Sequence, residues 1–203
     1  VGSEMCIRDS YFDVTRGDVP VNSVDVSFEA AKGIGYIKVS KFARNTYNEF
    51  ITAIAKLKQA GCTSFVIDLR GNTGGYMDAA INMINEFMPE GRLIVYTEGK
   101  SFPRSDVYAN GTGTCKDAPI VVLTDEISAS ASEIFSGAIQ DNDRGTIVGR
   151  RSFGKGLVQR QIPYSDGSAL RLTTARYYTP TGRSIQKPYT IGDDDSYEED
   201  IWN

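Results

Sequence analysis

The sequence predicts an α/β fold, a core of mixed sheet and helices with an antiparallel hairpin near its C-terminal end. Strand-like and helix-like segments alternate along residues 24–148, which is typical of α/β domains. Apolar residues are 40% of the 203 residues and charged residues 24%, so the chain can form an ordinary hydrophobic core. A later alternating stretch, residues 157–178, turns at Ser165-Asp166-Gly167 and predicts the hairpin.

Short apolar or alternating runs predict the other strands. They lie at residues 24–28, 35–39, 65–69, 93–96, 119–123 and 146–148. Residues 98–118 are polar and contain glycine, so we expect them to form mostly loop.

Apolar residues at helical spacing predict three helices. The first begins at Thr46, where Glu49 three residues later predicts a capping box, and it ends at Gly61. The second helix covers residues 77–88 and the third residues 130–140.

The absence of histidine limits the chemistry more than any motif does. A chain without histidine has no Ser-His-Asp triad, no Cys-His dyad and no histidine-ligated zinc. Acid–base catalysis then depends on Lys, Asp, Glu, Tyr or Cys. Three cysteines make no disulfide framework, and we expect Cys62, between a helix and a strand, to pack in the core.

Charge is distributed unevenly along the chain. The net charge is -4, but six of the 26 acidic residues lie between Asp193 and Asp200 in a run with no base. The rest of the chain carries 20 acidic against 22 basic residues, so it is nearly neutral and gives no nucleic-acid signal. We interpret the acidic run as a solvated tail or a truncated linker.

Three segments carry residues that suit nucleophilic catalysis. Ser130 lies where a strand passes into a helix, whose first N–H groups have no intrahelical partner, although serine there also commonly caps the helix. Lys155 stands between two glycines ahead of the hairpin, where a solvated turn is the simpler interpretation. The glycine-rich turn at residues 71–75 offers backbone N–H groups to an oxyanion, and it equally suits an ordinary strand-to-helix turn.

Element lengths predict that Ser130 and Lys155 meet. A helix of about 12 residues from Ser130 spans roughly 18 Å, and a strand of about six residues returns roughly 20 Å. Strand alternation places Gln159 on the same side as Lys155, where its amide can orient the lysine amine. A lysine acts as a base near neutral pH only where burial disfavours its ammonium form, so we expect this lysine to be desolvated.

These residues predict a Ser-Lys dyad. Lys155 would take the proton from Ser130 Oγ, and Ser130 would attack a carbonyl carbon. Backbone N–H groups of Ala131 and of Gly74 or Gly75 would bind the oxyanion. This chemistry needs no metal and no cofactor.

Four motifs, taken together and in order, resemble those of the tail-specific, C-terminal processing serine proteases. They are residues 68–75 (DLRGNTGG), 128–134 (SASASEI), 152–159 (SFGKGLVQ) and 173–186 (TTARYYTPTGRSIQ). The resemblance, which covers about residues 11–190, implies a core similar to the crotonase and Clp-protease folds. It also implies that Ser130 is the nucleophile, Lys155 the base and Gln159 the support of the lysine, while Asp141 has a structural role.

The resemblance also implies a domain organisation. Residues 1–10 (VGSEMCIRDS) show no clear periodicity and are expected to be a non-native leader. Residues 11–22 would be the exit of a PDZ domain, most of which is missing. Residues 23–190 would be the protease core, and residues 191–203 an acidic, truncated tail.

We therefore expect a serine endopeptidase that cleaves proteins near their C-termini. Its partners would be protein or peptide substrates with free C-termini, without nucleic acid and without a small-molecule cofactor. An adaptor protein or self-association stays open. The resemblance implies that the full protein works in a bacterial cell envelope or periplasm.

Three alternatives stay open. Residues 149–155 match the first seven positions of a P-loop, but Gly156 stands where Ser or Thr should hold Mg²⁺, and a strand is expected next instead of a helix. A catalytically silent scaffolding module of the same fold would bind C-terminal tails without cutting them. An acyl-CoA enzyme of the same fold class would use the oxyanion site without the dyad.

Overall fold

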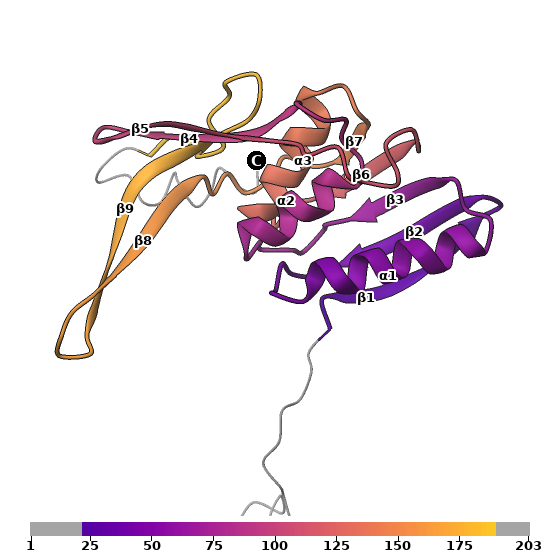
Figure 1. Cartoon of the computed structure of the whole chain (residues 1–203), viewed down its shortest axis with the longest axis horizontal. Coiled ribbons are helices and arrows are strands. Elements are labelled where there is room, and N and C mark those ends of the chain that lie inside the picture. Colours follow the sequence, from indigo (N-terminus) through magenta and orange to yellow (C-terminus); the bar gives the residue numbers. More distant parts are fainter. Residues whose placement is uncertain (1–21, 190–203) are drawn as a thin grey trace, which may run out of the picture.

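The computed structural model describes residues 22–189, which form two sheets and three helices (Figure 1). The five-stranded sheet has the strand order β1-β2-β3-β6-β7, and the four-stranded sheet the order β5-β4-β9-β8. The predicted mixed α/β class with an antiparallel part is therefore confirmed. The expected leader, PDZ exit and acidic tail lie outside the described residues, apart from residue 22.

The five-stranded sheet is parallel except for its first strand. β1 (Val24–Ala31) pairs antiparallel with β2 (Ile34–Val39). From β2 onward the neighbours are parallel, through β3 (Ser64–Asp68) and β6 (Ile120–Thr124) to β7 (Thr146–Gly149). The C-terminal ends of β3, β6 and β7 therefore meet at one edge of the sheet, which is where open α/β sheets commonly bind ligands.

Three helices cover one face of this sheet (Figure 1). They are α1 (Thr46–Gln59), α2 (Met77–Asn85) and α3 (Ala131–Asp141). The four-stranded sheet consists of β4 (Leu93–Gly99), β5 (Phe102–Tyr108), β8 (Leu157–Pro163) and β9 (Ala169–Tyr178), all paired antiparallel. α3 contacts both β7 and β4, so it lies between the two sheets.

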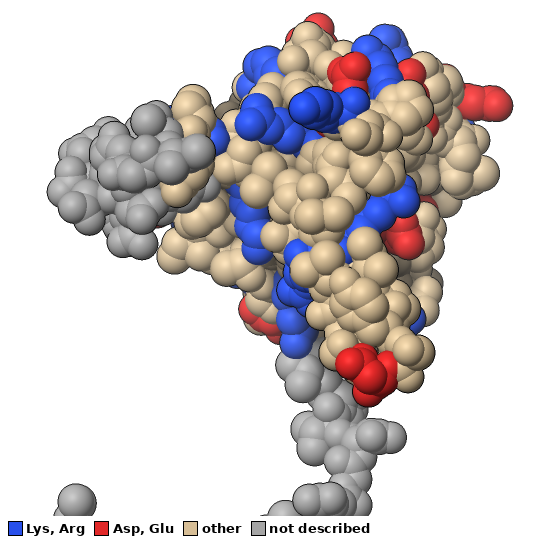
Figure 2. Space-filling view, turned by 90° about the vertical axis from the view of Figure 1, so that its left-hand side faces the viewer, with Lys and Arg blue, Asp and Glu red and all other residues tan. Residues whose placement is uncertain are grey.

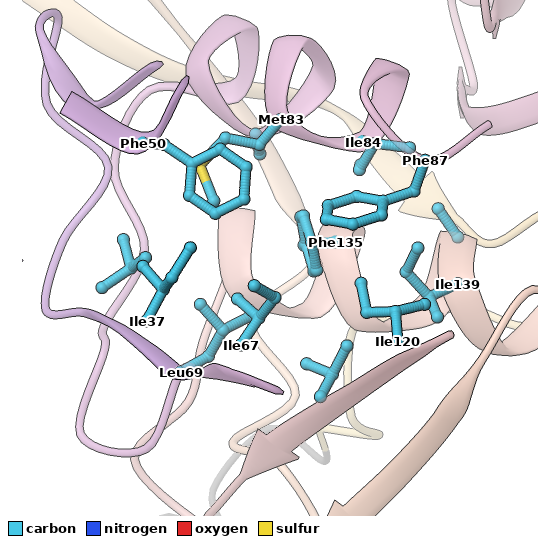
Figure 3. Packing of buried hydrophobic residues seen from close by; sticks show 14 of the residues in the cluster. Ile37, Phe50, Ile67, Leu69, Met83, Ile84, Phe87, Ile120, Phe135 and Ile139 are labelled. Carbon is cyan, nitrogen blue, oxygen red and sulfur yellow. The ribbon is translucent and has the colours of Figure 1, made fainter. Parts of the chain in front are cut away.

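A cluster of aromatic rings forms the centre of the core (Figure 3). The ring of Phe87, just after α2, lies edge-on to those of Phe50, Phe65 and Phe135, with centroids 6.2 to 6.5 Å apart. Such pairs each contribute about 0.5–1.5 kcal/mol beyond the burial of their area. Because the rings come from α1, β3 and α3, the cluster fixes the helices on the sheet that carries the site.

Residues 98–118 differ from the loop that their composition predicts. β4 continues to Gly99, and Phe102–Tyr108 forms β5, whose backbone pairs with that of β4. β5 is the outer strand of its sheet, so polar side chains are tolerated on it and hide the strand pattern. The pairing partner decides the conformation of this segment.

The predicted capping box at the start of α1 is also wrong. Asn45 is the N-cap residue, and the Thr46 hydroxyl oxygen accepts the N–H of Ala43 at 2.7 Å. The Glu49 carboxylate accepts the N–H groups of Ser23 at 2.6 Å and Val24 at 3.0 Å. Glu49 therefore fixes the start of β1 to the helix, a contact between segments that are distant in the sequence.

The other strands and the hairpin are confirmed within one or two residues, except that β1 continues three residues beyond the predicted end, to Ala31. The core position of Cys62 is also confirmed. Cys62 is 2% exposed. The second helix ends at Asn85 instead of residue 88, with Phe87 and Met88 turned into the core. Between residues 22 and 189, no helix is long and apolar enough to cross a bilayer.

Candidate active site

Three loops converge at the edge where the parallel strands end. The glycine-rich loop follows β3, the serine loop follows β6, and residues 150–156 follow β7. Backbone bonds connect them: Ala129 N donates to Asn72 O at 3.0 Å, and Phe153 N donates to Ser128 O at 3.0 Å. The site therefore forms from segments that the parallel sheet brings together.

Ser130 has an unusual backbone conformation. Its φ of 55° and ψ of -111° lie outside the regions that residues other than glycine normally occupy. Such strain costs on the order of 1–3 kcal/mol and often occurs at functional sites. A serine on a sharp strand-to-helix turn, half-buried at the start of α3, has the geometry of a nucleophile elbow.

The neighbouring serines serve the framework. Ser128 Oγ donates to Leu69 O at 2.9 Å, and Ser132 Oγ donates to Asn72 O at 2.9 Å. Both side chains are fully buried. These two hydroxyls hold the serine loop against the glycine-rich loop, whereas Ser130 lies between them on the open side of the turn.

A single buried carboxylate connects Ser130 with Lys155. Glu133 Oε2 accepts the backbone N–H groups of both Ser130 and Lys155, each at 2.8 Å. The two nitrogens therefore lie within twice that distance of each other. Glu133 Oε1 accepts Ser152 Oγ at 2.7 Å and Gly154 N at 2.6 Å. Burial raises the pKa of this carboxyl, while the four hydrogen bonds oppose that effect.

The glycine-rich loop approaches Ser130 closely. A Cβ on Gly74, whose φ is +98°, would lie 2.6 Å from Ala129 O and 2.7 Å from Ser130 Cβ. The N–H of Gly74 donates to Asn72 Oδ1 at 2.8 Å, so it is already engaged. Within residues 22–189, the N–H groups of Gly75 and Ala131 have no hydrogen-bond acceptor. Of the two predicted glycines, Gly75 is thus the one with a free donor.

The side chains of Lys155 and Gln159 are less engaged than the sequence analysis expects. Both residues are exposed, and within the described part of the chain neither donates a hydrogen bond to Ser130 or to the other. The physical reason is that β8 leaves the body of the molecule soon after Lys155 (Figure 1), so no element among residues 22–189 covers the amine. The expected burial of Lys155 is therefore wrong for the chain alone.

Two further carboxylates shape the loops. Asp68 is 1% exposed and accepts hydrogen bonds from Tyr36 at 2.5 Å and from the Arg70 guanidinium at 2.7 Å. Burial alone would raise the pKa of Asp68, but the bonds from Arg70 and Tyr36 hold it well below its usual range. Asp125 accepts the N–H groups of Gly71 and Ser128, at 2.9 and 3.0 Å, and so connects the glycine-rich loop with the serine loop.

Asp141 lies at the end of α3, away from this convergence. Its carboxylate accepts Thr181 Oγ1 at 2.6 Å and forms an ion pair with Arg183. It therefore fixes the turn that follows β9 to the helix that Ser130 begins. This geometry agrees with the structural role that the resemblance gives to Asp141.

The P-loop alternative is wrong. Leu157 begins strand β8, and residues 150–156 contain no helix that could direct N–H groups at a phosphate. In the part of the chain that the structure describes, no three His, Cys, Asp or Glu side chains are grouped as metal ligands.

Sequence reasoning missed Glu133, Asn72 and Asp125. Each is a polar residue that accepts backbone N–H groups from another loop. Glu133 stands three residues after Ser130, which is the capping-box spacing. That spacing is visible in the sequence. Only the fold shows that the same carboxylate also accepts hydrogen bonds from the segment at residues 152–155.

The sequence and the fold match those of a family of peptidases. Residues 33–195 match the profile of peptidase family S41. A "Carboxyl-terminal-processing protease" of Synechocystis sp. is 38% identical over 179 residues, which are 87% of this chain and 42% of the relative. A "Carboxy-terminal-processing protease" of Bartonella bacilliformis is 42% identical over 180 residues, 85% of this chain and 40% of the relative. The chain belongs to peptidase family S41, which confirms the family expected from the motifs.

A solved structure agrees with this assignment. The "photosystem II D1 C-terminal processing protease" superposes with a TM-score of 0.75 at 34% sequence identity, covering 85% of this chain and 47% of that one. This chain spans about two fifths of the length of the curated relatives it matches.

We predict that Gly74→Ala disrupts the site more than Gly71→Ala. Both glycines have positive φ, but a Cβ on Gly71 meets nothing within 4 Å. Each change should destabilise the fold by about 1 kcal/mol through backbone strain. Gly74→Ala should also displace Ser130 and lower any peptidase activity that depends on the Ser130 hydroxyl by about 100-fold. Urea unfolding and rate assays check this, and equal activities of the two variants would contradict it.

We predict that Glu133→Ala lowers the free energy of unfolding by at least about 2 kcal/mol, because four donors lose their acceptor. The exposed Glu90→Ala is the matched control and should change stability by less than about 0.5 kcal/mol. Urea unfolding of both variants measures the difference, and similar midpoints would contradict the role of this carboxylate.

The depressed pKa of Asp68 predicts a specific loss of stability in acid. Its carboxylate contributes stability above its unfolded pKa of about 4, and the contribution disappears as the pH falls further. Asp68→Asn should therefore flatten the decline in unfolding free energy below about pH 5. The control variant Asp78→Asn, at an exposed position, should show the same decline in unfolding free energy as the unchanged protein. Unfolding curves at a series of pH values test this, and identical slopes would be the contrary result.

Proposed function

We propose that this chain is the catalytic core of a serine endopeptidase that cleaves protein substrates near their C-termini with Ser130 as nucleophile and Lys155 as base. The observation that carries the proposal is the shared carboxylate. Glu133 Oε2 holds the backbone of both residues, beside the unengaged N–H groups of Gly75 and Ala131. The names of the relatives support the class of substrate.

In the proposed reaction, the substrate carbonyl lies over the start of α3. Neutral Lys155 accepts the proton of Ser130 Oγ, and the oxygen attacks the carbonyl carbon. The N–H groups of Ala131 and Gly75 donate to the oxyanion, and the positive end of the α3 dipole adds to this stabilisation. The lysine ammonium then protonates the leaving amine, and water releases the acyl group.

Because Lys155 is exposed, the bound substrate would also have to bury the lysine amine. A lysine side chain in water is mostly in its protonated ammonium form, because hydration stabilises that charge, and only the neutral amine can accept a proton. Lys155 has a flexible four-carbon stem and glycine on both sides, so its amine can reach toward Ser130. A polypeptide bound across the site would cover the amine and supply the burial that the free chain lacks. Gln159, four residues along β8, would then orient the amine.

The setting of the whole protein belongs to the same proposal. The chain spans about two fifths of the length of its curated relatives, so statements about the whole protein are proposals. The proposal includes a substrate-gating PDZ domain before residue 23 and a location in the bacterial cell envelope or periplasm. The family resemblance supports both. Fractionation of cells that express the full-length gene product would test the location.

We predict that Ser130→Ala abolishes cleavage. The test substrate is an unfolded protein with an apolar C-terminus, and intact-mass spectrometry identifies the products. The chain and its Ser130→Ala variant are compared, with and without an upstream domain from the full-length protein. Products that only the Ser130 forms generate would support the proposal. Binding without cleavage in every form would favour the tail-binding module, and turnover of a CoA thioester would favour the acyl-CoA enzyme.

Lys155 variants separate the base from a mere positive charge. Lys155→Arg keeps the charge but cannot deprotonate, so it should be as inactive as Lys155→Met. Lys32→Arg, in the exposed turn between β1 and β2, is the matched control and should keep full activity. An active Lys155→Arg enzyme would exclude Lys155 as the base.

A further inference from the structure

Charge is strongly segregated within the described chain. Residues 144–189 contain nine basic residues and one acidic residue, Asp166. Residues 22–143 contain 11 basic and 15 acidic residues. The near-neutral total of the body thus hides an excess of positive charge in the segment that holds Lys155 and the β8–β9 hairpin.

Three of these cations, Arg160, Arg171 and Arg176, form together with Lys100 of the neighbouring β4–β5 turn what we call the basic hairpin surface. All four are exposed or half-exposed, and Figure 2 shows Lys and Arg side chains running along this side of the molecule. Between residues 22 and 189 none of the four forms an ion pair, unlike Arg183, which pairs with Asp141.

The hairpin presents these cations on both of its faces. Arg160 pairs in register with Leu172, and Arg171 pairs with Gln161, so Arg160 and Arg171 point to opposite faces. Arg176 shares the face of Arg171, because it pairs with Leu157 and the register shift between Val158 and Gln159 changes the alternation of β9 by one residue. A groove of about 520 Å³ is lined by Arg176, Lys100 and one acidic residue, Glu98. An anionic chain along the hairpin would therefore meet positive charge on either side.

The surface is continuous with the proposed active site. β8 begins two residues after Lys155, and it is the outer strand of its sheet, so its outer edge pairs with no other described strand. An extended polypeptide can add to such an edge through main-chain hydrogen bonds. Arg160 would lie roughly 16 Å along that strand from Lys155, at 3.3 Å per residue. A substrate that occupies the site and follows β8 thus passes the cations.

We propose that the basic hairpin surface captures an acidic, extended stretch of the substrate polypeptide, next to the segment that is cut. The proposal rests on the function proposed above. Exposed Leu157, Ile162 and Leu172 lie among the cations, which suits a polypeptide with both apolar and acidic side chains. The net charge of -4 for the whole chain disfavours nucleic acid as the occupant.

Binding to the inert Ser130→Ala chain tests the proposal without cleavage. Three fluorescent peptides share one apolar C-terminal sequence and differ upstream, with four Glu, four Gln or four Lys residues. We expect the Glu peptide to bind at least about tenfold more tightly than the Gln peptide, at about two- to fivefold per ion pair. The difference should shrink strongly at 0.5 M salt, because exposed charges are screened. Equal affinities, or tighter binding of the Lys peptide, would overturn the proposal.

Charge variants locate the surface. Arg160→Gln, Arg171→Gln and Arg176→Gln together should remove most of the preference for the Glu peptide and leave the affinity for the Gln peptide unchanged. The matched control changes three exposed cations elsewhere, Lys32, Lys56 and Arg92, to Gln, and it should keep the preference. If the control loses the preference equally, the effect belongs to net charge alone and the proposal fails. Thermal unfolding of both triple variants verifies that they are folded.

Two other occupants are outcomes of the same assay. A single-stranded oligonucleotide that binds more tightly than the Glu peptide would assign the surface to nucleic acid and overturn the proposal. The acidic run at residues 193–200 is tested by changing its six acids to amides in the full chain. Unchanged affinity for the Glu peptide supports the proposal, whereas a rise above tenfold would show that the chain itself occupies the surface.

Cleavage assays distinguish this proposal from the function on which it rests. If the unchanged chain cuts both Glu and Gln peptides at equal kcat/KM, the peptidase stands and the capture surface fails. If it binds the Glu peptide selectively but cuts nothing, the peptidase proposal fails while the surface stands as a binding site.

Discussion

The arrangement of the site depends on the buried carboxylate of Glu133. It accepts four hydrogen bonds, from Ser130, Ser152, Gly154 and Lys155, which belong to two loops that follow different strands. A buried carboxylate is stable only when its acceptor sites are filled, because desolvation disfavours its charge. The loops therefore cannot separate without leaving a charge unpaired. The requirement to satisfy one carboxylate holds the backbone of the proposed nucleophile close to the backbone of the proposed base.

The strain at Ser130 follows from the same framework. Its left-handed conformation persists because Gly74 packs against its Cβ and the hydroxyls of Ser128 and Ser132 hold the flanking backbone. Glycine is required at position 74, since any side chain there would occupy the space of the serine loop. The Gly75 and Ala131 N–H groups then stay unengaged beside Ser130. Electrostatic stabilisation of an oxyanion requires free N–H donors that are held in place by a rigid environment.

The site is rigid on one side and open on the other. Glu133, Asp125 and Asp68 organise the loops at the sheet edge, while Lys155 and the hairpin beyond it face solvent. The division matches the charge distribution, because residues 144–189, which include the open side, contain nine basic residues and one acidic residue. In the proposed function, a bound polypeptide completes the open side, both by covering Lys155 and by adding along β8.

The sequence by itself determined the α/β class, most strand and helix positions, the hairpin and the family, because these depend on local periodicity and on motifs that are continuous in the chain. It also indicated that Ser130 and Lys155 meet, from element lengths alone. Only the tertiary structure decided that residues 102–108 form a strand, that Glu49 anchors β1, that Gly75 has the free N–H group and that Lys155 is exposed. Glu49 contacts a segment that is distant in the sequence, and the exposure of Lys155 depends on which elements cover it. The strand at residues 102–108 and the free N–H of Gly75 depend on hydrogen bonds with nearer segments, β4 and Asn72. In each case the folded backbone selects the partner, and the residue pattern of the segment does not.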